Sequence, residues 1–239
     1  MQAEGHVEII LAVLTHHHHD HIGGVSDLLS LTGPSLRLAK FTGVPELNED
    51  VLHQQVPGMP SSLVSLTDGE VLRVEGATLR VLHTPGHTKD HLCLYLEEER
   101  ALFSADCILG QGTAVFEHLG SYISSLEKLL PFKPERIYPG HGPVIEGGEA
   151  KIREYISHRN AREAQIVEFM KANGGAGPLT AMQMVKQIYA AYPEALHEPA
   201  KGSVWLHLGK LEEEGRVTRV RAGGEDEDDA FFLQEASKI

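Results

Sequence analysis

The stretch Thr15-His16-His17-His18-His19-Asp20-His21-Ile22-Gly23-Gly24 concentrates metal-binding side chains in a chain of 239 residues that holds 15 histidines. Read as H-x-H-x-D-H, it selects His16, His18, Asp20 and His21. Two histidines two positions apart at the end of a strand point to the same side. The adjacent Asp20 and His21 suit a second, neighbouring metal. Because imidazole and carboxylate are typical zinc ligands, the stretch predicts a metal site.

An affinity tag and a plain polar loop are the two other interpretations of this stretch. A tag is a run of histidines near a terminus. Here the histidines are interrupted by Asp20 and lie between an apolar segment, Val7–Leu14, and a helical pattern that begins at Val25. This arrangement of strand, polar loop and helix favours the metal site.

Composition limits the classes of protein that the chain can represent. Apolar residues make up 41% and charged residues 23%, which is typical of a globular protein. The 21 Lys and Arg against 34 Asp and Glu give a net charge of −13, which opposes sequence-independent binding of polyanions. Cys93 and Cys107 are too few for a disulfide framework, so a reducing, intracellular compartment is expected. No membrane partner is expected, because no run approaches 18 apolar residues.

Strands and helices alternate along the first part of the chain, up to about Ile145. A helix is predicted from Val25 to Leu31, ending at Gly33, and another over Ser121–Leu130. The predicted strands are Val7–Leu14, Leu36–Phe41, Leu63–Leu66, Glu70–Glu75, Thr78–His83, His91–Leu96, Ala101–Asp106 and Arg136–Pro139.

The pattern changes near residue 149, where a second domain is predicted, so that the domains are 1–148 and 149–239. Helices over Glu149–Ala172, Thr180–Tyr192 and Lys201–Glu214 precede a hairpin, which together indicate a winged-helix module. Its expected wing tip, residues 225–229, is acidic and opposes phosphate contact. We therefore expect a packing module without specific binding to duplex DNA.

Three further motifs each place a ligand-capable residue directly after an apolar strand: Thr84-Pro-Gly-His87, Ser104-Ala-Asp106 and Tyr138-Pro-Gly-His141-Gly. Together with H-x-H-x-D-H, in this order and with similar gaps, they resemble the metallo-β-lactamase superfamily. The resemblance implies an α+β fold, an αββα sandwich of two sheets between helical layers. It implies one zinc ion held by His16, His18 and His87, a second held by Asp20, His21 and His141, and Asp106 bridging the two.

Within the superfamily the chain is similar to the β-lactamase-like protein 2 group. The segments that carry this similarity are Gly-His87-Thr-Lys-Asp-His91, Phe103–Gly110, Tyr138–Ile145, Tyr-Ile-Ser-His158-Arg-Asn-Ala-Arg162 and the C-terminal Leu196–Arg216. The group implies a zinc-dependent endoribonuclease that cleaves single-stranded RNA and is mitochondrial in animals. A location in the mitochondrial matrix or the cytoplasm is expected. In catalysis, Asp20 is expected to accept a proton as well as to bind metal.

Two alternatives to the endoribonuclease stay open. A thioesterase of the glyoxalase II type, acting on acyl thioesters, shares Thr-Pro-Gly-His87-Thr and the aspartate at 106. A nucleic-acid-binding or scaffold protein would use the winged helix while the metal site stays idle. Neither the substrate nor the oligomeric state follows from the motifs, because nucleases, thioesterases and lactamases share the ligand set.

The remaining histidines receive weaker assignments. His91 is expected to be a buried side chain that supports a ligand. His158 and Arg159 either meet a substrate anion or lie on a solvated helix face. By alternation His17 and His19 point away from the metals and are interpreted as surface groups.

The position of the H-x-H-x-D-H stretch leads to one more expectation. Members of the family have several strands before it, whereas fourteen residues precede Thr15 here. The strand Val7–Leu14 would then have an uncovered edge, which favours aggregation. We expect a shortened chain, less soluble and less active than a longer form.

Overall fold

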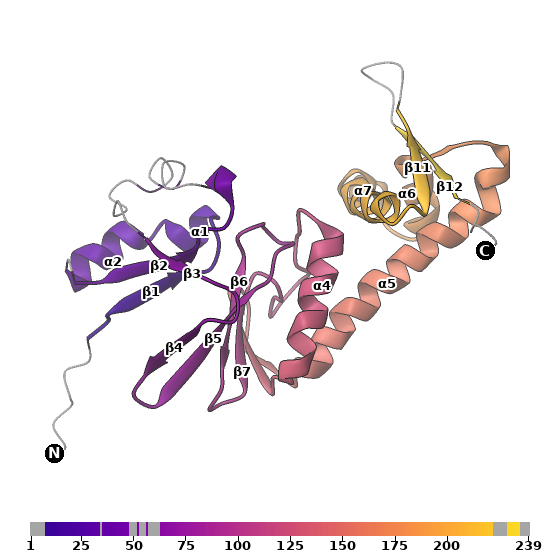
Figure 1. Ribbon diagram of the computed structural model, residues 1–239. Helices are drawn as coiled ribbons and strands as arrows, with labels where there is room; N and C mark the ends of the chain where they lie inside the picture. The colour runs from indigo at the N-terminus through magenta and orange to yellow at the C-terminus, as the bar shows by residue number, and fades with distance from the viewer. Residues whose placement is uncertain are drawn as a thin grey trace. The chain divides into compact units, whose positions relative to one another are not determined.

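The structure, a computed structural model, describes residues 8–33, 35–47, 52, 56, 63–221 and 229–234 (Figure 1). The chain divides into two compact units, Met1–Glu117 with Ser124–Arg153, and His118–Ile123 with Glu154–Ile239. Among the described residues, no helix combines the length and apolar character needed to cross a membrane.

The first unit contains a small parallel sheet that carries the H-x-H-x-D-H segment at one end. Its strands are β1 (Leu11–Leu14), β2 (Arg37–Phe41) and β3 (Val64–Leu66), in that order. Helices α1 (His19–Ile22) and α2 (Val25–Thr32) connect β1 to β2, and the short helix η1 (Pro45–Leu47) follows β2. The predicted first strand is shorter than expected, since residues 8–10 have no regular structure and Val7 lies outside the described residues.

The second sheet of this unit has six strands in the described part of the chain, in sequence order. The strands are β4 (Val71–Val74), β5 (Ala77–His83), β6 (Leu92–Leu96), β7 (Ala101–Ala105), β8 (Arg136–Pro139) and β9 (Ile145–Glu146). All neighbouring pairs are antiparallel except β7 and β8, which the crossover through α4 (Leu119–Leu129) and η2 (Leu130–Phe132) makes parallel.

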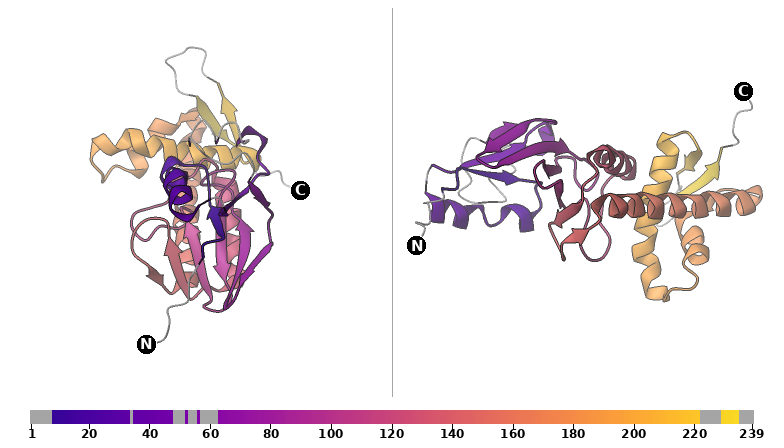
Figure 2. Two further views of the ribbon diagram at one scale, coloured as in Figure 1. Left: turned by 90° about the vertical axis from the view of Figure 1, so that its left-hand side faces the viewer. Right: turned by 90° about the horizontal axis from the view of Figure 1, so that it is seen from below.

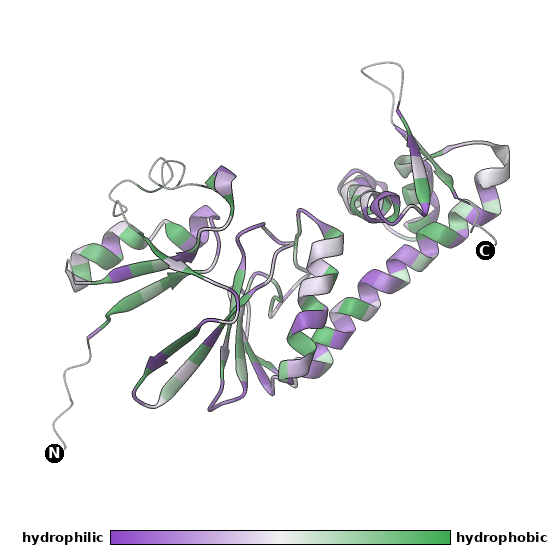
Figure 3. Ribbon diagram, viewed as in Figure 1, coloured by the Kyte–Doolittle hydropathy of each residue, from purple (hydrophilic) through white to green (hydrophobic). Residues whose placement is uncertain are grey.

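Alternation along β1 explains how the layers pack. Leu11 and Val13 join an apolar cluster with residues of the six-stranded sheet, whereas Ala12 and Leu14 join a cluster with α1 and α2. Side chains on successive positions of a strand face opposite sides, so this strand is apolar on both (Figure 3). On the far side of the other sheet, Lys128 of α4 donates to the His83 carbonyl at 2.8 Å. The predicted αββα layers are confirmed.

The strand directions bring the four motifs to one edge. β5 and β7 are both antiparallel to β6, and β7 is parallel to β8, so the C-terminal ends of β5, β7 and β8 meet at the same edge. The backbone N–H of Leu92 donates to the Thr15 carbonyl at 2.8 Å, which ties the end of β1 to the start of β6.

The second unit is a winged helix. It comprises the greater part of α5 (Gly148–Asn173), whose uninterrupted course is visible in the right-hand view of Figure 2, followed by η3 (Gly174–Ala176), β10 (Leu179–Thr180), α6 (Ala181–Ile188), η4 (Glu194–Leu196), α7 (His197–Glu213), β11 (Val217–Val220) and β12 (Ala230–Leu233). The three strands described in this unit pair antiparallel in the order β10, β12, β11. The predicted wing tip lies outside the described residues, Asp229 excepted.

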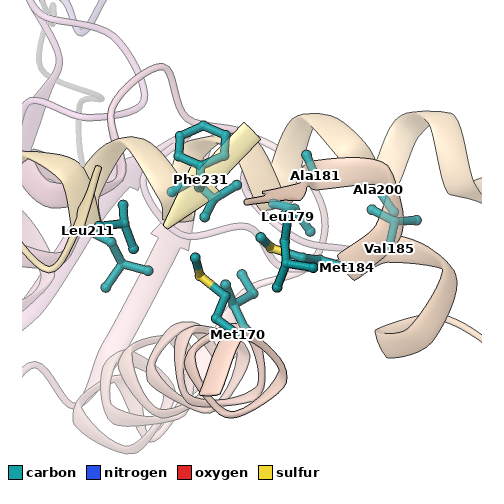
Figure 4. Close-up of a cluster of buried hydrophobic side chains, with 12 residues drawn as sticks. Met170, Leu179, Ala181, Met184, Val185, Ala200, Leu211 and Phe231 are labelled. Carbon is teal, nitrogen blue, oxygen red and sulfur yellow. The ribbon is translucent and has the colours of Figure 1, made fainter. Parts of the chain in front are cut away.

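The core of the winged helix is apolar and built from its helices α5, α6 and α7 and its strands β10, β11 and β12. Met170 of α5, Met184 of α6, Leu211 of α7 and Phe231 of β12 are buried together (Figure 4). Trp205 packs on the edge of this core against Phe231, with ring centroids 5.2 Å apart. The three helices and the hairpin therefore form a unit with its own hydrophobic core.

An open groove of about 440 Å³ lies in the first unit between the outer edges of its two sheets. Its lining is largely apolar and includes Ile10 of the segment before β1, which is 47% exposed, and Val74 of β4, which is 58% exposed. β1 and β4 are the edge strands of their sheets in the described part of the chain.

Candidate metal centre

Three histidines from two loops converge on one point. His16 and His18 follow β1, and His87 follows β5. The Nε2 atom of His87 lies 3.2 Å from Nε2 of His16 and 3.0 Å from Nδ1 of His18, and these two atoms are 3.1 Å apart. We call these residues the three-histidine cluster.

The protonation of the three-histidine cluster suits a cation. Burial, together with the neighbouring histidines, lowers the pKa of His16, and burial lowers the pKa of His87. Nδ1 of His87 donates to the Val115 carbonyl at 2.6 Å, so its Nε2 atom carries a lone pair. A tetrahedral zinc ion with bonds of about 2.0–2.1 Å holds two nitrogen ligands roughly 3.3 Å apart. The three nitrogens fit such an ion.

A second group of ligands lies beside the first. Asp20 and His21 come from α1, Asp106 follows β7, and His141 follows β8. Nε2 of His141 is 3.0 Å from Oδ2 of Asp20 and 3.3 Å from Nε2 of His21. The carboxylate of Asp106, 3.3 Å from Nε2 of His21, raises the pKa of that histidine against the effect of burial. We call this group the mixed cluster.

Asp106 lies between the two clusters. Its Oδ2 atom is 3.7 Å from Nε2 of His87 and 3.6 Å from Nε2 of His141. Burial acts to raise the pKa of Asp106, but the nearby imidazole of His21 and the charges of His141 and His87 lower it. Its Oδ1 atom is buried and has no hydrogen-bond partner of good geometry among the described residues. A buried carboxylate oxygen without a donor fits a cation as its partner.

The backbone before Asp106 has an uncommon conformation. Ala105 has φ of 42°, in the left-handed region, and the β7–β8 register shifts between Phe103 and Ala105. Non-glycine residues adopt positive φ at a cost, which the surrounding structure must offset. The carbonyl of Ala105 accepts a hydrogen bond from the backbone of Gly140 at 2.8 Å, and this contact joins the Asp106 and His141 loops.

His91 belongs to neither cluster. It is fully buried, and its Nε2 atom accepts a hydrogen bond from the backbone N–H of Asp106 at 3.2 Å. Its other ring nitrogen therefore donates to Oγ1 of Thr84 at 2.9 Å. The imidazole holds the Asp106 loop through the main chain.

The structure corrects the prediction for Arg159 and separates it from His158. Both residues lie on α5 in the second unit, but His158 is exposed and Arg159 is only 7% exposed. Arg159 is therefore not part of a solvated helix face. Helix α5 packs within the second unit and buries one face there. The polar sequence around residue 159 did not indicate this buried face.

The prediction that His17 is a surface group is wrong. Its side chain is 18% exposed, and Nδ1 donates to Oδ1 of Asp90 at 3.0 Å. Ring nitrogens of His17 and His18 also lie within 4.8 Å of a carboxylate oxygen of Glu117. His19, by contrast, is exposed. Asp90 and Glu117 were not predicted as site residues, because neither is a ligand position of the four motifs.

Comparisons with known proteins match both parts of the chain. A family described as the metallo-beta-lactamase superfamily matches residues 6–141, and the beta-lactamase-associated winged helix domain matches residues 180–225. The first match covers more than half of the chain and contains both clusters. The resemblance inferred from the four motifs is confirmed.

Individual relatives cover most of the chain. A Drosophila melanogaster protein named beta-lactamase-like protein 2 homolog is 44% identical over 232 residues, which are 95% of this chain and 75% of that protein. An Aspergillus chevalieri protein named atrochrysone carboxyl ACP thioesterase is 38% identical over 202 residues, which are 83% of this chain and 61% of that protein. The crystal structure of a metallo-beta-lactamase family protein from Thermus thermophilus has a TM-score of 0.65 at 27% identity and covers 94% of this chain and 79% of that one.

Proposed function

The chain belongs to the metallo-β-lactamase superfamily of metal-binding hydrolases, and on this basis we propose that it is a two-zinc endoribonuclease that cleaves single-stranded RNA. The observation that carries the two-metal part is the position of Asp106, within 3.7 Å of His87 in one cluster and 3.3 Å of His21 in the other. A carboxylate so placed is suited to bind two cations at once.

The ligand assignment follows from the two clusters. His16, His18 and His87 would hold one ion, Asp20, His21 and His141 the other, and Asp106 both. Zinc bound in this way lowers the pKa of water to about 7 and stabilises negative charge on substrate oxygens. The ligands are imidazole and carboxylate, both of which bind zinc in proteins.

In the proposed reaction Asp20 has a second role besides metal binding, and Asp106 depends on His91 for its position. Asp20 is more than half exposed, and its Oδ2 atom converges with His141 Nε2 at 3.0 Å, so its other carboxylate oxygen would accept a proton during hydrolysis. Asp106 is kept in place through its main chain by His91. Proton acceptance by Asp20 and the fixed position of Asp106 would serve the hydrolysis of any ester and do not themselves select a substrate.

RNA is proposed as substrate because the resemblance to the β-lactamase-like protein 2 group implies an endoribonuclease, and a protein named for this group matches 95% of the chain. The net charge of −13 opposes long-range capture of a polyanion. Two divalent cations at the cleavage point offset this repulsion where the phosphate must lie. The proposal therefore predicts slow capture of RNA and steep inhibition by chelators.

Acyl thioesters are the second candidate substrate. The observation in their favour is the 38% identity to a protein named as an acyl carrier protein thioesterase. The same clusters would bind a thioester carbonyl in place of a phosphate. A phosphodiester and a thioester are readily distinguished by assay.

The test compares the zinc-loaded chain on labelled single-stranded RNA and on an acyl thioester, side by side. His141→Ala removes a ligand, and His19→Ala is the matched control, because His19 is exposed and outside both clusters. RNA cleavage that falls by about 100-fold or more in His141→Ala, and stays within about threefold in His19→Ala, is expected. Turnover of the thioester alone would replace the endoribonuclease by the thioesterase. Tight binding of duplex DNA without turnover of either substrate would favour a scaffold.

A further inference from the structure

Asp90 is a fully buried carboxylate that receives hydrogen bonds from three separate donors. Nζ of Lys40 contacts Oδ2, while Nδ1 of His17 and Oγ1 of Thr88 donate to Oδ1 at 3.0 and 2.7 Å. Burial acts to raise the pKa of Asp90, but Lys40, His17 and Thr88 together lower it. The carboxylate is therefore ionised and paired with a lysine that is itself 1% exposed.

Each donor is attached to a segment that carries or adjoins the three-histidine cluster. His17 stands between His16 and His18 in the chain, and Thr88 directly follows His87. Lys40 is the β2 residue paired in register with Leu14, the last residue of β1. Through Asp90, the end of β2, the H-x-H segment and the His87 loop are joined at one point.

The charged pair has no evident value for stability alone. Lys40 lies in β2 on the same side as Leu38, by alternation, where an apolar side chain would complete the cluster against α1 and α2. Removing two charges from water is costly, and a buried ion pair is often no more stabilising than apolar side chains of similar size. Such a pair is well suited to fixing the positions of the groups bonded to it.

We propose that Lys40 and Asp90 are positioning residues, which hold His16, His18 and His87 in the geometry that binds one metal ion. This inference rests on the proposed metal-dependent function. The support is direct for the three-histidine cluster, because His17 and Thr88 are chain neighbours of its members. None of the described hydrogen bonds of Asp90 reaches a residue of the mixed cluster. The loss of metal affinity is therefore expected to be larger at the three-histidine site than at the other site.

The test measures zinc affinity at both sites by competition with a chromophoric chelator. His87→Ala and His141→Ala identify the sites, since each removes a ligand from one cluster. In Asp90→Asn we expect the affinity of the three-histidine site to fall by about 10- to 100-fold, with the other site within about threefold. The double variant Lys40→Met/Asp90→Asn leaves no buried charge without a partner and is expected to show the same selective loss while remaining folded.

Lys89→Ala is the matched control, because Lys89 is next to Asp90 in the chain but 68% exposed and paired with Glu46 at the surface. Both affinities should be unchanged in it. Unaltered affinity at the three-histidine site in the folded double variant would overturn the inference, and so would an equal loss at both sites. Failure of the unmodified chain to bind two ions would instead reject the proposed function.

Discussion

Gly140 lies so close to Asp106 that no side chain fits between them. A Cβ atom at position 140 would be 2.5 Å from Oδ1 of Asp106 and 3.0 Å from Cε1 of His21. Contacts of 2.5 Å do not occur between such atoms, so the carboxylate would have to move. The glycine of the Tyr-Pro-Gly-His141 motif is thus required by the approach of the Asp106 loop.

Gly140→Ala is expected to disturb the mixed cluster without unfolding the chain. The displaced Asp106 carboxylate would lose its contact with His21, and zinc content should fall from about two equivalents toward one. Gly24→Ala is the control, since a Cβ there meets nothing within 4 Å. Elemental analysis of both folded variants after zinc loading checks the prediction. Two tightly bound equivalents in Gly140→Ala would show that Asp106 is free to shift.

Asp106→Ala tests whether this carboxylate belongs to both metal sites. It lies within 3.7 Å of ligands in both clusters, so its removal should lower the affinity for both ions. We expect about two zinc equivalents in the unaltered chain and about one or fewer in the variant, measured by elemental analysis after dialysis. A fully loaded unaltered chain with one equivalent would contradict a two-metal centre.

Replacing His17 and His19 one at a time distinguishes the role of His17 in the structure from the role that strand alternation predicts. Alternation alone predicts that neither matters. His17 donates to buried Asp90, whereas His19 is exposed, so we expect His17→Ala to weaken zinc at the three-histidine cluster by about tenfold. His19→Ala should leave both sites within about threefold. Competition titrations of the two variants, under identical conditions, decide between the interpretations.

Much of the candidate centre could be predicted from the sequence, because its ligands sit in short motifs at the ends of strands. The spacing of His16 and His18 fixes their common direction, and an apolar strand precedes each of His87, Asp106 and His141. The convergence of these strand ends is a matter of topology, which the resemblance supplied. The role of Asp90 was not predictable, since its ion pair with Lys40 joins positions 50 residues apart.

Secondary structure was missed where elements are very short or begin unexpectedly. Strands β9 and β10 have two residues each, too few for any periodic pattern. Helix α7 begins at His197, four residues earlier than predicted, with Pro199 inside its first turn. Proline is tolerated there, because the first N–H groups of a helix have no intrahelical partner.

His207 makes the stability of the winged helix dependent on pH. This residue of α7 is fully buried, and neither ring nitrogen has a hydrogen-bond partner among the described residues. Burial lowers its pKa to about 4, and the nearby charges of Arg159, Arg162 and Lys210 act in the same direction, against Glu163. The ring is therefore neutral in the folded unit at pH 7.

The sign of the pH effect follows from this lowered pKa. Unfolding returns His207 to its ordinary pKa of about 6.5, so the unfolded chain binds more protons between pH 6.5 and 4. The contribution of neutral His207 to the free energy of unfolding is fully present above pH 6.5 and decreases as the pH drops toward 4. Below pH 4 it changes no further. Between pH 8 and pH 5 the free energy of unfolding should decrease by about 2 kcal/mol from this group.

His207→Leu should remove this contribution, because leucine fills the buried site without a titratable group or an unsatisfied nitrogen. Trp205, the one tryptophan in the chain, packs on Phe231 and reports unfolding of this unit by fluorescence. Urea titrations of the metal-free protein at pH 8 and pH 5 give the two free energies, and chelation excludes effects of the metal centre. His197→Gln, on the same helix, is the control and should keep the full dependence. If His207→Leu and the unaltered chain lost equal stability at pH 5, the neutral buried state of His207 would be refuted.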